Sequence, residues 1–89
     1  MEKQIKELLK TYTNRQVILN YYHGEELTKR DGFHFNSIMI KHDSLNFIKS
    51  SKVILTINLN EFPEASISWD FQHYFVLRKG NERLDVYFP

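Results

Sequence analysis

The chain has 89 residues, enough for one domain with a thin core, and 42% of them are hydrophobic. It carries 12 lysines and arginines against 11 aspartates and glutamates, and this balance excludes both a globally basic nucleic-acid binder and an acidic mimic of DNA. Because cysteine is absent, disulfide bonds, thiolate catalysis and cysteine-ligated metals are excluded. We expect a cytoplasmic protein with no membrane partner, since no apolar run approaches the roughly 18 residues of a membrane span.

The N-terminal residues predict an amphipathic helix over residues 2–13. Apolar side chains recur there at the spacing of one helix face: Ile5, Leu8, Leu9 and Tyr12. About three helical turns are too short to be stable alone, so this face must dock on the rest of the domain. Asn14 ends the helix, and the pattern behind it has a different period.

From residue 15 onward the apolar pattern has a period of two, which predicts short β-strands. The first strand ends near His23-Gly24, and later strands are expected over residues 33–40, 45–48 and 53–59. Residues 35–48 also fit a helical stripe, so a helix there remains an alternative. Their many β-branched and aromatic residues and the interrupting turn residues favour strands.

The most regular alternation in the chain covers residues 65–71. Four apolar residues alternate with three polar ones: Ala65, Ile67, Trp69 and Phe71 against Ser66, Ser68 and Asp70. Such alternation is typical of a strand with one buried and one solvated face. We therefore expect the side chain of Trp69 to be buried.

A β-hairpin is predicted over residues 74–88. Its turn is Gly80-Asn81, because glycine in the first position suits a two-residue type II′ loop. In that register Leu77 faces Leu84 on an apolar face. The other face pairs Arg78 with Arg83 and Tyr74 with Tyr87.

These elements predict an α+β fold for a single domain, residues 1–89. A short N-terminal helix (2–13) precedes a β-meander (15–88), a mostly antiparallel curled sheet or small barrel of about six strands. The order of elements and the segments 17–24, 32–33 and 57–62 resemble the YolD-like group of the Sm-like small barrels. The long helical region that precedes the barrel in YolD-like chains is missing, and the hairpin 74–88 is extra. The resemblance implies single-stranded RNA as a ligand to test.

Catalytic and metal-binding signatures are weak in this sequence. The four histidines show no HxH, HxxxH or HExxH spacing, and there is no GxSxG elbow or glycine-rich phosphate loop. We expect no catalytic residues, no metal and no cofactor. Two histidine–aspartate pairs, Asp31 with His34 and Asp70 with His73, keep an enzyme as the third hypothesis.

The candidate binding residues lie on the polar face of the hairpin, with Lys79 at its tip: Tyr74, Arg78, Lys79, Arg83 and Tyr87. Tyrosine and arginine are frequent anchors of protein interfaces, and on a β-surface they also stack on bases and meet phosphates. Asp85 on the same face weakens the positive potential. The alternative interpretation is an ordinary solvated strand face whose tyrosines pack on a neighbour.

The function predicted first is a small non-enzymatic binding or adaptor domain that acts through protein–protein contact, with a protein partner or with its own copy. The strand predicted to offer an exposed edge for such pairing is Arg83–Phe88. The alternative is single-stranded nucleic-acid binding by the basic aromatic face of the hairpin.

Overall fold

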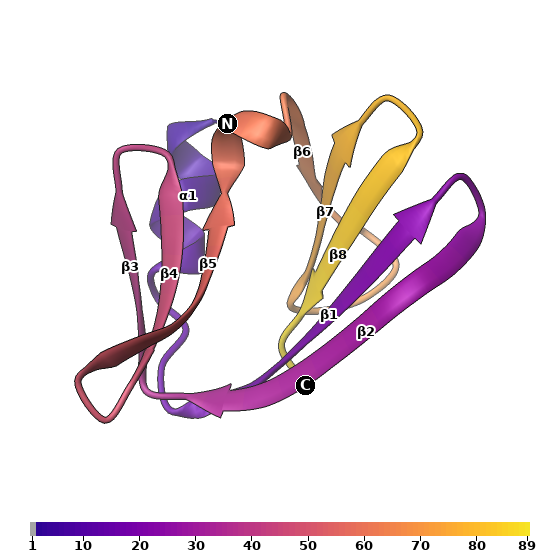
Figure 1. The fold of residues 1–89 in the computed structure, drawn as a ribbon. Coiled ribbons are helices and arrows are strands. Elements are labelled where there is room, and N and C mark those ends of the chain that lie inside the picture. Colours follow the sequence, from indigo (N-terminus) through magenta and orange to yellow (C-terminus); the bar gives the residue numbers. More distant parts are fainter. Residues whose placement is uncertain (1) are drawn as a thin grey trace.

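The computed structural model describes residues 2–89, and Figure 1 shows their arrangement. One short helix, one 3-10 turn and eight strands follow one another along these residues. In chain order they are α1 (Lys3–Leu9), β1 (Arg15–His23), β2 (Glu26–Phe35), β3 (Ser37–Lys41), β4 (Ser44–Lys49), β5 (Lys52–Asn58), η1 (Leu59–Glu61), β6 (Glu64–Ile67), β7 (Tyr74–Lys79) and β8 (Glu82–Tyr87). The predicted α+β class is confirmed, and the strands outnumber the six that were expected.

The strands form two antiparallel sheets that face each other across the core (Figure 1). One sheet has five strands in the order β2-β1-β8-β7-β6, and the other has three in the order β3-β4-β5. Neither sheet closes on itself among the described residues, so the expectation of a closed barrel is wrong and that of a curled antiparallel arrangement holds. β8 pairs with β1 on one side and β7 on the other. The prediction that Arg83–Phe88 offers a free edge is therefore wrong.

The helix α1 is shorter than predicted, because it ends at Leu9 and the chain turns over the next two residues. Ile5 and Leu9 are buried, whereas Leu8 is 37% exposed. The Nζ atom of Lys6 lies 3.0 Å from Oδ1 of Asp43 in the turn between β3 and β4. This ion pair and the apolar face together dock the helix, as its length requires.

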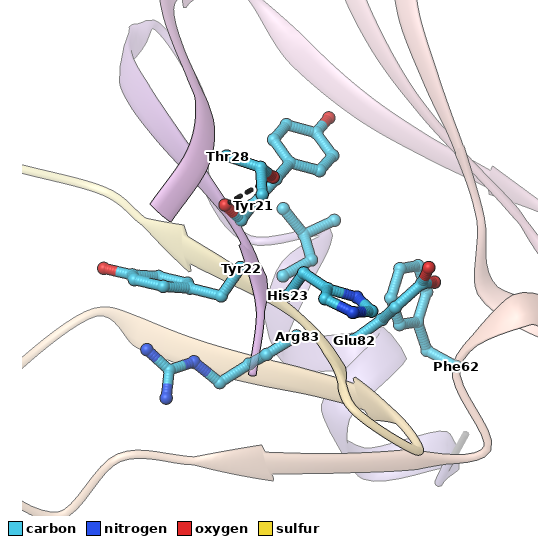
Figure 2. A pocket seen from close by; sticks show the side chains of 8 residues that line it. Tyr21, Tyr22, His23, Thr28, Phe62, Glu82 and Arg83 are labelled. Atoms are coloured by element: carbon cyan, nitrogen blue, oxygen red, sulfur yellow. Dashed lines mark hydrogen bonds between the residues drawn. The ribbon is translucent and has the colours of Figure 1, made fainter. Parts of the chain in front are cut away.

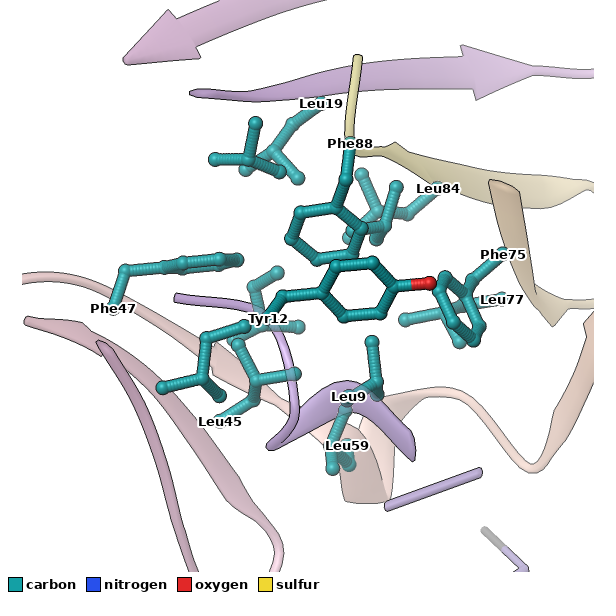
Figure 3. Close-up of a cluster of buried hydrophobic side chains, with 14 of the residues drawn as sticks. Leu9, Tyr12, Leu19, Leu45, Phe47, Leu59, Phe75, Leu77, Leu84 and Phe88 are labelled. Carbon is teal, nitrogen blue, oxygen red and sulfur yellow. The ribbon is translucent and has the colours of Figure 1, made fainter. Parts of the chain in front are cut away.

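Aromatic rings join α1, the two sheets and the C-terminal residues in one core (Figure 3). Tyr12, just after the helix, stacks on Phe88 with ring centroids 4.0 Å apart and an interplanar angle of 6°. Phe88 also meets Phe35 and Phe75 edge to face, at 5.8 and 6.0 Å. The ring of Phe88, directly after β8, thus packs in the same core as the residues of the N-terminal helix.

Residues 35–48 are strands, so the alternative of a helix there is wrong. Asn36 interrupts the extended chain between β2 and β3, and its backbone connects the two sheets. Its N–H donates to the carbonyl of Ile48 at 2.7 Å, and its carbonyl accepts from the N–H of Asn14 at 2.9 Å. His42, with φ of 56°, forms the tight turn that returns the chain into β4.

The hairpin of β7 and β8 has the predicted turn and register. Gly80 has a φ of 57°, a value that costs glycine little and side-chain-bearing residues more. Tyr74 pairs with Tyr87 and Arg78 with Arg83, as expected. Both predictions are confirmed.

The alternating segment 65–71 departs most from its prediction. β6 covers only its first part and pairs with β7 up to Ile67. Beyond it the chain leaves the sheet, so Trp69 is 100% and Phe71 62% exposed. The expectation of a buried Trp69 is wrong, because alternation buries a face only where another layer covers it.

Candidate functional site

The predicted hairpin residues gather on the outer face of the five-stranded sheet, the face turned away from β3-β4-β5. Tyr74 and Tyr87 lie opposite each other with ring centroids 5.7 Å apart. Arg78 pairs with Arg83 nearer the tip on the same face, and the pair Val76 and Asp85 lies between them and the tyrosines. Lys79 is the residue after Arg78, and alternation along the strand directs it to the opposite face. Four of the five predicted residues therefore share a surface, and Lys79 does not.

A buried carboxylate lies beneath this surface. Asp85 is only 3% exposed, and the hydroxyl of Tyr74 donates a hydrogen bond to its Oδ2 atom. Nε of Arg83 lies 2.9 Å from its Oδ1 atom, which makes an ion pair. Neither of these two atoms has a well-directed hydrogen bond in the described chain, so proximity of the charges holds the pair together. Asp85 thus takes up much of the positive charge that Arg83 would offer a ligand.

Tyrosine rings cover the ion pair from solvent. The guanidinium of Arg83 lies over the ring of Tyr22, 4.0 Å from its centroid. Burial raises the pKa of the Tyr74 phenol above its ordinary value, and the hydrogen bond and charge of Asp85 raise it further. Tyr74 therefore stays protonated as a donor at physiological pH.

Two residues that the sequence analysis did not single out extend this cluster into β1 and β2. Asn20 is 7% exposed and pairs with Asp85 across β1 and β8. Nε of Arg30 donates a hydrogen bond to Oδ1 of Asn20 at 2.8 Å. The alternation of β1 marks Asn20 as an outward-facing residue. Its burial comes from neighbours on other strands, which no local pattern shows.

A second surface lies beside the hairpin, where the loop after β6 passes α1. We call it the aromatic groove, and it forms an open hollow of about 620 Å³. Its rim carries exposed apolar side chains, and its floor is formed by two core rings. The rim residues are Leu8, Ile67, Trp69 and Phe71, and the floor residues are Tyr12 and Phe75.

The floor of the aromatic groove is fixed by several contacts. Tyr12 meets Phe75 edge to face at 5.9 Å and stacks on Phe88. Its hydroxyl lies 3.0 Å from Nδ1 of His73 on the groove wall. Phe71 contacts Tyr74 at 5.4 Å and so links the groove to the outer face of the sheet. The groove offers a preformed apolar floor, and exposed aromatic side chains stand at its rim.

A second, smaller hollow of about 180 Å³ lies near the tips of the β1-β2 and β7-β8 hairpins (Figure 2). His23 and Glu82 point toward Phe62 there, whereas Tyr22 and Arg83 point to the opposite side. A neighbouring hollow of about 130 Å³ shares Phe62 as a wall. The larger of the two is lined by charged residues of both signs, Glu82 and Arg83, and the smaller by a single charged residue, Glu61.

The histidine–aspartate pairs singled out in the sequence do not assemble into a larger centre. Within residues 2–89, no three His, Cys, Asp or Glu side chains gather closely enough to hold a metal ion. His73 instead meets the hydroxyl of Tyr12. Among the same residues, no helix has both the length and the apolar character needed to cross a membrane.

Comparison of the chain with protein-family models, curated proteins and solved structures finds no match. The resemblance to the YolD-like group therefore remains a prediction.

Proposed function

We propose that this chain is a non-catalytic binding domain that acts through protein–protein contact at the aromatic groove. The observation that carries the proposal is the complete exposure of Trp69 beside the largely exposed Phe71. Clusters of exposed apolar side chains on folded domains mark interaction sites, and tryptophan is the most enriched residue at interface hot spots. Leu8 and Ile67 extend the same apolar surface to α1 and β6.

The rigid floor supports this proposal, because a preformed site loses little conformational freedom on binding. Tyr12 is 7% exposed, stacks on Phe88, meets Phe75 edge to face and is held at its hydroxyl by His73. A partner therefore meets an ordered aromatic floor, and only the rim side chains lose conformational freedom when it binds. The charge of the loop favours a protein over a membrane, since Asp70 next to Trp69 repels anionic headgroups.

Selection from a random peptide library against the immobilised chain tests the proposal. We expect the selected peptides to carry apolar or aromatic anchors and to lose binding to the double variant Trp69→Ala, Phe71→Ala. The matched control is Val53→Ala, because Val53 is 52% exposed but lies on β5, in the other sheet. Peptides that bind the double variant as tightly as the unaltered chain would contradict the proposal.

Single-stranded nucleic acid on the outer face is the second candidate. It is favoured by the line of rings from Phe71 through Tyr74 to Tyr87, with centroids 5.4 and 5.7 Å apart, next to the exposed Arg78. It ranks second because Asp85 pairs with Arg83. Salt-sensitive binding of single-stranded RNA, weakened by Arg78→Ala, would support it; no binding at low salt would exclude it.

A further inference from the structure

The described residues that line the aromatic groove include one carboxylate, that of Asp70, and no lysine or arginine. Asp70 stands between Trp69 and Phe71 in the sequence, and all three residues are exposed. Within residues 2–89, no ion pair includes Asp70, and no lysine or arginine lies over the ring of Trp69 or Phe71. A negative charge and two aromatic rings are therefore available to a ligand.

The basic residues of the helix beside the groove are already balanced by carboxylates. Lys6 and Lys10 each form an ion pair, with nitrogen–oxygen distances of 3.0 and 2.9 Å. Outside these two pairs, residues 2–10 carry one glutamate and one lysine, whose charges are opposite. The charge of Asp70 is therefore left to set the sign of the potential at the groove, and it attracts a cation.

The outer face of the five-stranded sheet shows how a ring and a carboxylate of this chain hold an arginine. The guanidinium of Arg83 lies 4.0 Å from the ring centroid of Tyr22, and its Nε atom lies 2.9 Å from Oδ1 of Asp85. A planar guanidinium makes both contacts at once, because its face stacks on a ring while its N–H groups point outward in the plane. The aromatic groove has rings and a carboxylate on adjacent residues, and the described chain places no arginine between them.

We infer that the aromatic groove binds an arginine side chain of a partner protein, in an exposed segment where an apolar residue stands next to the arginine. The inference rests on the proposed function, because it uses the same groove, and it names the chemistry of the partner. The guanidinium stacks on Trp69 and meets the carboxylate of Asp70. The apolar neighbour enters the hollow above Tyr12 and Phe75. Tryptophan holds a cation better than the other aromatic residues do, and the contact gains strength where water is excluded.

Arginine fits this site better than lysine does. A guanidinium is more weakly hydrated than an ammonium group, so it loses less when it leaves water for the face of a ring. It also donates two parallel hydrogen bonds to one carboxylate, whereas an ammonium meets the carboxylate as a point charge. A partner with apolar side chains alone would cover Asp70 without a counter-charge, at a cost in desolvation. The carboxylate thus selects among the apolar segments that the rings would accept.

Peptides from the library selection against the immobilised chain test this inference. We expect the selected sequences to share an arginine next to an apolar residue. In one selected peptide that arginine is then replaced by citrulline, which has nearly the same shape and no charge. Isothermal titration calorimetry measures the binding of both peptides at low and high salt. We expect the citrulline peptide to bind about five- to 20-fold more weakly at low salt, since it loses an ion pair and a cation–π contact. High salt should reduce the difference.

Variants assign the effect of charge to Asp70. Asp70→Asn should weaken the arginine peptide and leave the citrulline peptide unchanged, so a double-mutant cycle should show coupling between the two changes. Glu26→Gln is the matched control, because it removes one exposed carboxylate from β2, at the opposite edge of the sheet from β6.

Two outcomes would overturn the inference and leave the proposed function standing. One is a set of selected peptides that need Trp69 but carry no arginine. The other is an arginine peptide that binds no better than its citrulline form. Peptides that bind the double variant Trp69→Ala, Phe71→Ala as tightly as the unaltered chain would overturn both the inference and the proposed function.

Discussion

The hydroxyl of Tyr74 donates a hydrogen bond to the buried carboxylate of Asp85 on the outer face of the five-stranded sheet. This contact ties β7 to β8 through side chains that the sequence marks as outward-facing. It also occupies the groups that a ligand of the hairpin face would need. The bond therefore helps to decide which of the two aromatic surfaces is open to a partner.

Substitution of Asp85 by alanine should destabilise the fold. It leaves the hydroxyl of Tyr74 without its acceptor and Arg83 without its counter-charge, which costs about 1–3 kcal/mol. Urea denaturation measures the loss, and a double-mutant cycle with Tyr74→Phe should show coupling between the two sites. Asp70→Ala, in the exposed loop, is the control and should change little. Strictly additive effects would show that the bond contributes nothing.

The stability of the fold should fall in alkaline solution partly through Tyr74. Burial and Asp85 raise the pKa of this phenol in the folded state above the ordinary 10.0. The folded chain then keeps a proton that the unfolded chain loses, so the contribution is complete below pH 10 and is lost as the pH rises above it. Urea denaturation at several pH values should show a shallower alkaline decline for Tyr74→Phe. Burial also raises the pKa of Tyr12 and of Tyr21, so these two phenols contribute to the alkaline slope that remains. Equal slopes in both proteins would contradict the assignment.

Phe88→Ala should be among the most destabilising single substitutions. The ring is 0% exposed and contacts Tyr12, Phe35 and Phe75. Loss of such a buried ring costs about 3–5 kcal/mol, a large part of the roughly 5–15 kcal/mol that stabilises a typical domain. Thermal and urea denaturation measure the effect, with Val53→Ala as the exposed control. A loss below 1 kcal/mol would contradict the packing described for the ring of Phe88.

Trp69→Ala should leave the stability of the fold nearly unchanged while it abolishes binding at the aromatic groove. The side chain is 100% exposed, and substitutions at such sites change the free energy of unfolding by only about 0.5 kcal/mol or less. Urea denaturation measures this change. A loss of 2 kcal/mol or more would show that Trp69 packs on its own chain and is no docking residue.

Local patterns in the sequence predict the hairpin correctly and the segment 65–71 incorrectly, and the difference has a physical cause. Gly80-Asn81 and the flanking alternation specify a turn and a register within a few residues. The burial of Trp69 depends instead on whether another layer of the fold covers it, and that layer would have to come from residues distant in the sequence. The position of β8 between β1 and β7 depends likewise on the pairing of residues about 70 positions apart, such as Ile18 with Tyr87. Such pairings leave no local signal.

The candidate site was only partly visible in the sequence for the same reason. The shared face of Tyr74, Arg78, Arg83 and Tyr87 follows from register alone. The burial of Asp85 needs Tyr22 and Asn20 from a distant strand. The aromatic groove forms because α1 and the loop after β6 lie side by side. The local sequence of neither segment predicts this contact.

The most direct test of the central claim is to map a selected peptide onto the ¹⁵N-labelled chain by NMR. If the aromatic groove is the binding surface, amide shifts should change at Leu8, Tyr12 and residues 67–73 and stay constant on β3 and β5. Changes confined to Arg78, Arg83 and Tyr87 would place binding on the outer face of the sheet and contradict the claim.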